Sequence, residues 1–480
     1  MLAFTRLQAG QFRNLLRKSV LTACARASAP AVLLEGTPDG LRLVCGHGDL
    51  ALTRRVPGPG AAVRIALPLS ALEACAGTTD APVDVQAEDG TVWLRWQQGR
   101  LPCQQRFDSA RADLHQPALA VPASWQESPP GLLEALAQAT RSAATGAGRY
   151  ALDHLLLDGA SATITATDGR HLLVQQGWAF PWKGQLLVPK LPVFGCRELA
   201  GAGPVRVGQT ATQVVLEVGP WTLHLPVLKD GRFPPVASVI PRPESLPTVL
   251  HLAPEDAAFL AEVVPQLPGA GDPDAPITLD IGPTVAVRAR AAGQPQATEV
   301  LLVRSHGTGP PVRLALHRDL LARALALGLT TLQIAAPDKP VLAQDAARRF
   351  VAMPLAREAS VPPAPDVLRL SSAAPTPATA SRPARPIPPV ETSPLPPRTT
   401  LMASRALTNG NGPTPVPEPL PAKTSGYAAV LAEAQALQSL LRDGLGRTNQ
   451  LLTALKQHRR QAKAVQSSLL ALRELQTVDA

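Results

Sequence analysis

Proline is concentrated in one stretch of this chain, and that stretch divides the chain in two. Residues 356–425 hold 17 of the 51 prolines of the 480-residue sequence, with Ala, Ser and Thr filling most of the remaining positions. Such a segment buries too little apolar surface to offset the entropy of ordering it, and polyproline stiffness keeps it extended. We therefore expect a disordered linker over 357–425, so that any large globular fold is completed before it.

The segment after the linker has a different composition. Residues 427–476 contain no proline, and one heptad register places apolar residues at most of its a and d positions. This predicts a helical tail over 426–480 with an interrupted coiled-coil pattern. The second half of the tail carries a basic face, which fits a solvated helix surface better than a specific nucleic-acid contact. The residues of that face are Lys456, Arg459, Arg460 and Lys463.

The first 355 residues are typical of an α+β protein. Short alternating stretches such as VWLRW, ATITAT and ITLDI predict strands, and the segments 10–23, 130–144 and 317–328 predict helices between them. A long repeat is also present, because 32–52 aligns with 155–174 through an apolar triplet, an acid, a glycine and an alternating strand. Gly48 and Gly169 correspond in the two copies, which predicts a tandem of similar domains.

Net charge, cysteine spacing and the length of apolar runs bear on the class of protein. The formal net charge of +9 is compatible with nucleic acid or an anionic surface without requiring either. The five cysteines include no CxxC pair, which favours reduced thiols in a cytoplasmic protein over disulfides or a metal site. No run approaches the length of about 18 apolar residues that spans a membrane.

The N-terminal 34 residues are basic and contain no acid, as in an organelle transit peptide. They also fit a folded amphipathic helix, since Arg13 and Arg17 share one face while Phe12, Leu15 and Leu16 lie on another. We favour the folded helix.

Enzymatic motifs are incomplete. His317-Arg318-Asp319 matches part of a kinase catalytic loop, but Ala324 stands where the metal-binding Asn is expected. The glycines near 146–148 lack a strand-GxGxxG-helix context, and no HExxH motif or Cys/His metal spacing occurs. We expect no catalysis, no cofactor and no metal.

One stretch, VLKDGRFPPVASVIP at 227–241, carries a family resemblance. It resembles the junction between the second and third domains of the bacterial DNA polymerase III beta subunit, the sliding clamp. Segments 149–174, 184–194, 334–345 and 348–356 are similar to other parts of that family, in the same order. Single motifs of this kind are weak, whereas several in the right order are fairly specific.

The resemblance implies three tandem sliding-clamp domains at 1–122, 123–247 and 248–356, with sheets outside and helices inside. It implies a homodimeric ring that encircles double-stranded DNA without sequence preference and acts as a processivity factor. It further implies partner peptides from the DNA polymerase and the clamp loader, and a bacterial cytoplasmic, nucleoid-associated location without membrane contact. Encirclement retains DNA by topology, so phosphate contacts can stay few and weak.

The implied DNA-facing residues are basic side chains on the expected inner helices, together with one loop near the rim. Each also fits an ordinary solvated charge, and residues 1–355 hold 32 basic against 29 acidic residues, so the positive charge would have to be concentrated on that face. The expected inner helix at 254–265 carries three acids and no base, which departs from the pattern. The candidates are Arg13, Arg17, Lys18, Arg141, Arg149, Tyr150, Lys190, Arg197, Arg318 and Arg323.

The resemblance also implies an apolar pocket for short peptides between the second and third domains. The sequence departs from the family at three places: Arg170-His171 stand in inverted order, and Ser238 and Ala356 replace arginines. These residues also fit a plain domain-interface core. The pocket candidates are Leu152, Thr167, Gly169, Arg170, Leu172, Pro234, Val239, Val351, Met353, Pro354 and Leu355.

The alternative function is that of a clamp-fold paralogue, a scaffold for protein interactions that does not encircle DNA. The acidic 254–265 segment favours this alternative, and the pocket positions favour the clamp.

Overall fold

The computed structural model describes residues 2–23, 30–58, 62–88, 90–109, 119–146 and 148–373. The predicted helical tail and most of the predicted linker lie outside these residues.

Four sheets make up most of the described fold. The first has the order β1-β6-β7-β8 and the second β5-β2-β3-β4-β16-β15-β14-β9; the third is β13-β10-β11-β12-β25-β24-β23-β17-β21 and the fourth β22-β18-β19-β20-β26. The strands are β1 (Leu2–Thr5), β2 (Val32–Thr37), β3 (Gly40–His47), β4 (Leu50–Pro57), β5 (Arg64–Leu67), β6 (Pro82–Glu88), β7 (Thr91–Gln98), β8 (Leu101–Asp108), β9 (Trp125–Glu127), β10 (His154–Asp158), β11 (Thr163–Thr167), β12 (His171–Gln176), β13 (Gln185–Pro189), β14 (Val205–Gln209), β15 (Gln213–Val218), β16 (Trp221–Pro226), β17 (Thr248–His251), β18 (Pro276–Ile281), β19 (Val285–Ala289), β20 (Thr298–Leu302), β21 (His306–Thr308), β22 (Val312–His317), β23 (Thr331–Ile334), β24 (Val341–Gln344), β25 (Arg348–Ala352) and β26 (Leu368–Ser371).

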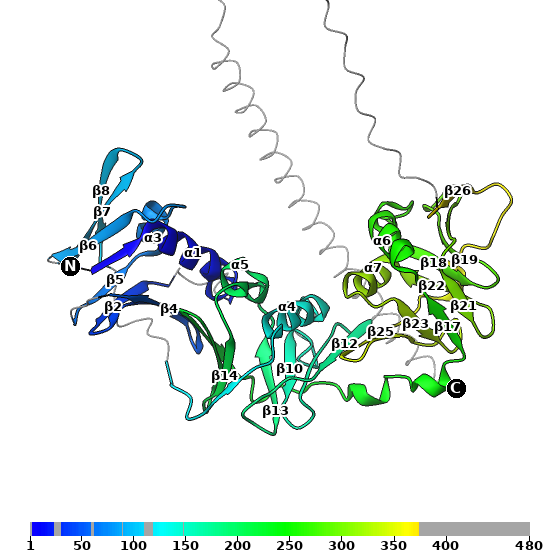
Figure 1. Cartoon of the computed structure of the whole chain (residues 1–480), viewed down its shortest axis with the longest axis horizontal. Coiled ribbons are helices and arrows are strands. Elements are labelled where there is room, and N and C mark those ends of the chain that lie inside the picture. The colour runs from blue at the N-terminus through cyan, green and yellow to red at the C-terminus, as the bar shows by residue number, and fades with distance from the viewer. Residues whose placement is uncertain are drawn as a thin grey trace, which may run out of the picture. The chain divides into compact units, whose positions relative to one another are not determined.

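Short helices accompany the sheets (Figure 1). Direct contacts link some of them: Asn14 of α1 donates a hydrogen bond to Glu198 of α5, and Arg323 of α7 donates one to the Gln138 carbonyl of α4. The helices are α1 (Arg6–Arg17), α2 (Val20–Ala23), α3 (Leu69–Cys75), α4 (Leu132–Ser142), α5 (Arg197–Ala200), α6 (Pro254–Val263) and α7 (Arg318–Ala326), and the 3₁₀ turns are Pro192–Gly195, Val236–Ser238, Pro243–Ser245, Val264–Gln266 and Arg357–Ala359.

Helix α1 forms where the amphipathic pattern predicted a folded helix. Its first turn is closed by a capping box, in which the Thr5 hydroxyl accepts from the Gln8 amide and the Gln8 side chain accepts from the Thr5 amide. Phe12, Leu15 and Leu16 are fully buried against the neighbouring sheets. The apolar face of the helix is therefore part of the core.

The aligned repeat segments adopt the same structure. Segment 32–52 forms β2, β3 and the start of β4, and segment 155–174 forms most of β10, β11 and β12. Gly48 and Gly169 occupy the same turn in the two meanders with φ of 58° and 89°, a left-handed conformation that favours glycine. The internal sequence repeat thus reflects a repeated three-stranded unit.

Two sheets continue from one meander into another. Strand β4 pairs antiparallel with β16, and β12 pairs antiparallel with β25. Each of these four strands is the last strand of its meander. Continuous backbone pairing therefore joins the successive parts of the fold.

Ordered structure continues beyond the expected linker boundary at residue 357. A 3₁₀ turn at Arg357–Ala359 is followed by β26, which pairs parallel with β20. Val361 is buried, and its amide donates a 2.7 Å hydrogen bond to Thr278. The expectation of a linker was therefore wrong for 357–373, because apolar residues and an open sheet edge outweigh the local proline content. We call residues 355–373 the strap.

No helix among the described residues is long and apolar enough to cross a membrane.

Candidate functional site

A cavity of about 230 Å³ lies where β12 meets β25, beneath the connector that follows β16. Its surface is almost entirely apolar. The residues that line it are Tyr150, Leu152, Thr167, Gly169, Arg170, His171, Leu172, Pro234, Val236, Val239, Val351 and Met353.

The base of the cavity is formed by two paired strands. Leu172 of β12 and Val351 of β25 are register partners, and both are buried. Behind them, Leu246 and Leu342 complete a small apolar cluster with the connector residues packed against it. The base is therefore rigid, since its position is fixed by a sheet and by packing.

One wall is the tight turn between β11 and β12. Asp168 Oδ1 accepts hydrogen bonds from the amides of Arg170 and His171 at 2.8 and 2.9 Å. Partial burial alone would raise the pKa of the Asp168 carboxyl, but hydrogen bonds from His171 and these amides lower that pKa to about 2. Gly169 completes the turn with positive φ. The Asp168 carboxylate thus stabilises the turn by accepting its amide hydrogen bonds. The cavity surface that the turn helps to form remains almost entirely apolar.

The opposite wall comes from the connector. Phe233 packs against Ala151, Leu156 and Leu187, and the Ala151 amide donates a hydrogen bond to the Arg232 carbonyl. This anchoring positions the prolines that follow. The DGRFPP stretch, which follows the end of β16 at Pro226, therefore anchors the connector beside the cavity.

Exposed apolar side chains lie at the mouth of the cavity. Val239 and Met353 are 48% and 39% exposed, which is unusual for large apolar side chains. Arg170 supplies a charge at the rim, where its guanidinium lies 3.2 Å from Asp274. A rigid apolar base with an exposed apolar mouth suits the side chains of a short peptide.

The structure brings together nine of the eleven residues proposed for this pocket. Pro354 and Leu355 do not line it, and the Leu355 amide instead donates to the Ala315 carbonyl of β22. His171 and Val236 line the cavity although neither was among the pocket candidates, and Tyr150 lines it although we had expected it near DNA. The positions of His171 and Val236 in the sequence could have identified them, because His171 lies between the candidates Arg170 and Leu172, and Val236 lies in the 3₁₀ turn that directly follows Pro235.

Most of the basic candidates for DNA contact are accessible. Arg17, Lys18, Arg141, Arg149 and Arg197 are exposed, and Arg13 on α1 is half-buried. Arg17 forms a 3.1 Å ion pair with Glu73, which partly neutralises the positive charge of Arg17. The Arg197 side chain is 92% exposed. The Arg149 guanidinium lies over the Tyr150 ring at 5.6 Å.

The structure contradicts the prediction that Arg318 faces DNA. Its side chain is only 2% exposed, and its guanidinium donates to the carbonyls of Ala275, Leu267 and Pro268. Burial lowers its pKa, although the charge of Asp319 opposes this. Arg318 therefore stabilises the loops beside α7 and cannot line a DNA-facing surface.

Two further candidates are partly committed to the fold. Arg323 donates to the Gln138 carbonyl at 2.5 Å, and burial, together with the charge of Arg141, lowers its pKa to about 10. The Lys190 ammonium donates to the Ala143 carbonyl, and burial lowers its pKa against the opposing charge of Asp153. Both residues have a structural role.

The acids of the 254–265 segment divide into two kinds. Asp256 is fully buried at the start of α6 and accepts hydrogen bonds from the Arg304 amide and the Ser305 hydroxyl. Burial would raise its pKa, but hydrogen bonds from Ser372, Ser305 and Arg304 lower it. Glu255 and Glu262 are exposed. The exposed face of α6 is therefore acidic.

Within the described ranges, no group of three or more His, Cys, Asp or Glu side chains is placed to hold a metal ion.

The fold is that of a DNA sliding clamp. Solved structures of bacterial clamps align with 74% of this chain and 99% of their own, at low identity. They include the DNA polymerase III subunit beta from Pseudomonas aeruginosa (19% identity, TM-score 0.60), a putative beta subunit from Eubacterium rectale (13%, 0.61) and the beta chain from Streptococcus pneumoniae (14%, 0.59).

No protein-family model and no curated protein matches the sequence. The resemblance to DNA polymerase III beta subunits predicted from the sequence is confirmed at the level of the fold. About a quarter of the chain lies outside the aligned part.

Proposed function

We propose that this protein is a divergent sliding clamp that holds partner proteins on duplex DNA and has no catalytic activity of its own. In this proposal three domains, 1–122, 123–247 and 248–356, form half of a ring that two copies complete. Partner proteins dock short peptides in the cavity between β12, β25 and the connector. DNA polymerase and loader subunits are the expected partners.

The cavity is the observation that carries the proposal. Nine residues chosen from motifs in three separate segments surround one apolar hollow. A domain-interface core would bury all of its large apolar side chains, but Val239 and Met353 remain exposed at the mouth. The exposed apolar side chains at the mouth therefore favour a ligand-binding pocket over a domain-interface core.

Griselimycin is a suitable probe, because a Pseudomonas aeruginosa clamp of the same fold has been solved bound to it. We expect the full chain to bind griselimycin in isothermal titration calorimetry. Val239→Asp and Met353→Asp should each weaken binding by about tenfold or more, because each places a charge at an apolar mouth.

Val121→Asp is the matched control, since Val121 is 83% exposed and does not line the cavity. It should bind griselimycin as the unaltered chain does. Equal affinities in all four proteins, or no binding by the unaltered chain, would count against a peptide pocket.

A scaffold that does not encircle DNA is the second candidate, and specific observations favour it. Arg318 is buried, the exposed face of α6 is acidic, and the strap covers a sheet edge in the part of the chain expected to close a ring. A chain that binds griselimycin but has no salt-dependent affinity for duplex DNA would be such a scaffold.

A further inference from the structure

Meanders in this fold are joined to one another through their last strands. The described residues form six three-stranded meanders: β2-β3-β4, β6-β7-β8, β10-β11-β12, β14-β15-β16, β18-β19-β20 and β23-β24-β25. The first strand of each pairs on its other side with one strand from outside the meander, which is β5, β1, β13, β9, β22 or β17 in the same order. The last strands pair with one another: β4 with β16, and β12 with β25. Two last strands are left over by this rule, β8 and β20.

If two copies of the chain join as the internal parts do, β8 of one copy pairs antiparallel with β20 of the other. Such pairing requires both edges to be open. Among the described strands, β8 has a neighbour only on its β7 side. Strand β20 is not open.

The strap occupies the β20 edge. It crosses the fourth sheet, because Leu355 bonds to Ala315 of β22, Val361 bonds to Thr278 of β18, and Leu368 bonds to Ala297 just before β20. Strand β26 then runs parallel to β20 from the Thr298–Leu368 pair to the Leu301–Ser371 pair. The parallel direction distinguishes this contact from the antiparallel junctions elsewhere in the fold.

Residues after β26 fasten its end. The Ser372 amide donates to the Leu301 carbonyl, the Ser372 carbonyl accepts from Arg304, and the Ser372 hydroxyl accepts from the Val303 amide. Ser372 also contributes a hydrogen bond to the buried Asp256 of α6. The strap is therefore connected to both the sheet and the adjoining helix.

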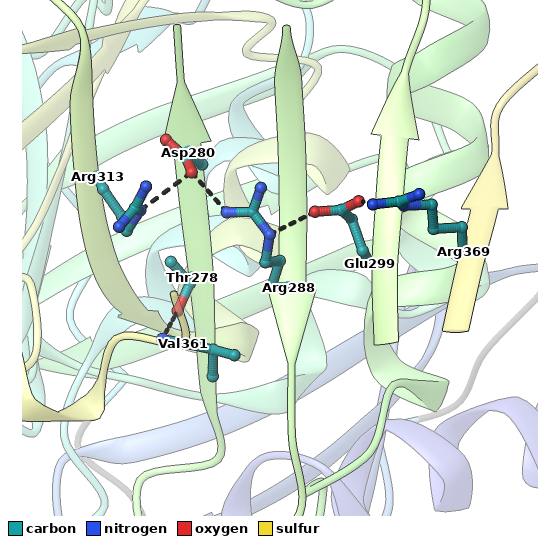
Figure 2. Close-up of polar contacts among 7 residues, drawn as sticks. All are labelled: Thr278, Asp280, Arg288, Glu299, Arg313, Val361 and Arg369. Carbon is teal, nitrogen blue, oxygen red and sulfur yellow. Dashed lines mark hydrogen bonds and ion pairs between the residues drawn. The ribbon is translucent and has the colours of Figure 1, made fainter. Parts of the chain in front are cut away.

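A row of alternating charges crosses the sheet and ends on the strap, as Figure 2 shows. Arg313 and Arg288 contact Asp280 at 3.0 and 2.5 Å. Arg288 contacts Glu299 at 2.5 Å, and Arg369 of the strap contacts the other oxygen of Glu299 at 3.1 Å. Glu299 is only 5% exposed, so loss of Arg369 would leave a buried carboxylate oxygen without its partner.

Strand β8, which has no second neighbour among the described strands, offers chemistry similar to that of the strap. It carries Arg106, which is exposed, and Leu101, which is 70% exposed. A cation on β8 could take the place of Arg369 beside Glu299, and backbone pairing would replace that of β26. The two strands therefore suit the same edge.

We propose that β26 is a built-in competitor for the β20 edge, which a second copy of this chain would otherwise cover with its β8. This inference rests on the proposed ring. The chain with its strap in place is a monomer, and release of the strap permits head-to-tail pairing.

The test compares full-length variants by sedimentation equilibrium at micromolar concentration. Arg369→Glu opposes Glu299 and should release β26, and an internal deletion of residues 366–373 removes β26 outright. Each should lower the dissociation constant of the dimer by about tenfold or more relative to the unaltered chain. Arg357→Glu makes the same charge change in the strap outside β26 and should leave the chain monomeric.

A second change identifies the competing strand. Arg106→Glu added to the deletion variant should return it to a monomer, because it places like charges at the β8–β20 contact. Thermal melting of every variant confirms that it is folded.

Two results would overturn the inference. An unaltered chain that dimerises as tightly as the deletion variant shows that β26 does not compete, and the ring survives. A deletion variant that stays monomeric removes both the competition and the ring, while griselimycin binding to the same sample still reports on the pocket separately.

Discussion

Arg318 carries its charge inside the protein, where four backbone carbonyls accept its hydrogen bonds. Replacement by Leu removes all of the hydrogen bonds that the guanidinium donates to these buried carbonyls. We expect Arg318→Leu to lower the free energy of unfolding by about 3 kcal/mol, measured by urea denaturation.

Arg197→Leu is the matched control, because the Arg197 side chain is 92% exposed. It should change the free energy of unfolding by less than about 0.5 kcal/mol. A similar small loss for Arg318→Leu would show that the buried hydrogen bonds contribute little.

His224 makes the β4–β16 junction sensitive to acid. It lies in β16 opposite Ala51 and is only 6% exposed, and burial, with a smaller effect of Arg42, lowers its pKa to about 4. The unfolded chain takes up a proton at His224 below about pH 6.5, which the folded chain resists. The free energy of unfolding should therefore fall by about 3 kcal/mol as the pH drops from about 6.5 to 4.

His224→Gln should remove this part of the pH dependence, measured by urea denaturation at a series of pH values. His47→Gln, at an exposed position in β3, is the control and should retain it. Parallel pH profiles for the unaltered chain and His224→Gln would disprove the role of His224.

At the scale of elements, helix α1 depends on its first turn. The Thr5 hydroxyl accepts from the Gln8 amide at 3.2 Å, and the Gln8 side chain accepts from the Thr5 amide at 2.9 Å. Thr5→Ala should lower the free energy of unfolding by about 1 kcal/mol. Thr78→Ala, at an exposed turn position, should cost much less when both are measured by thermal melting.

The strands and the pocket could be predicted to different degrees from the sequence. Nine pocket positions were found because each belongs to a short local motif, such as the turn at Gly169 or the strand before Met353. Tyr150 was misplaced because its motif marks a loop but not the side of the loop that faces the cavity. Periodicity likewise placed Arg318 on a helix without showing that neighbouring loops enclose it.

Strand β26 could not be predicted for a different reason. Proline dominates its surroundings, and a four-residue strand that pairs mainly through its backbone needs no alternating pattern. The open edge of β20 supplies the information that the segment itself lacks. Tertiary context therefore decides the structure of residues 368–371.

At the scale of the whole molecule, DNA affinity should depend on the exposed cations on and beside the helices. Arg197→Glu and Arg141→Glu should each weaken binding to duplex DNA and reduce the salt dependence of log K by about 1. Fluorescence anisotropy with labelled duplex at several salt concentrations measures both effects. Lys339→Glu, at an exposed position between β23 and β24, is the control for net charge. Equal effects of all three changes would indicate nonspecific attraction only.

The strap also bears on how such a protein could arise. Because strand pairing at a sheet edge asks little of the side chains, a few residues added after an existing domain can acquire that role without any change to the domain itself. Assembly and peptide recognition would then be inherited as separate traits. Selection could alter the number of chains that join while the cavity between β12 and β25 stays as it is.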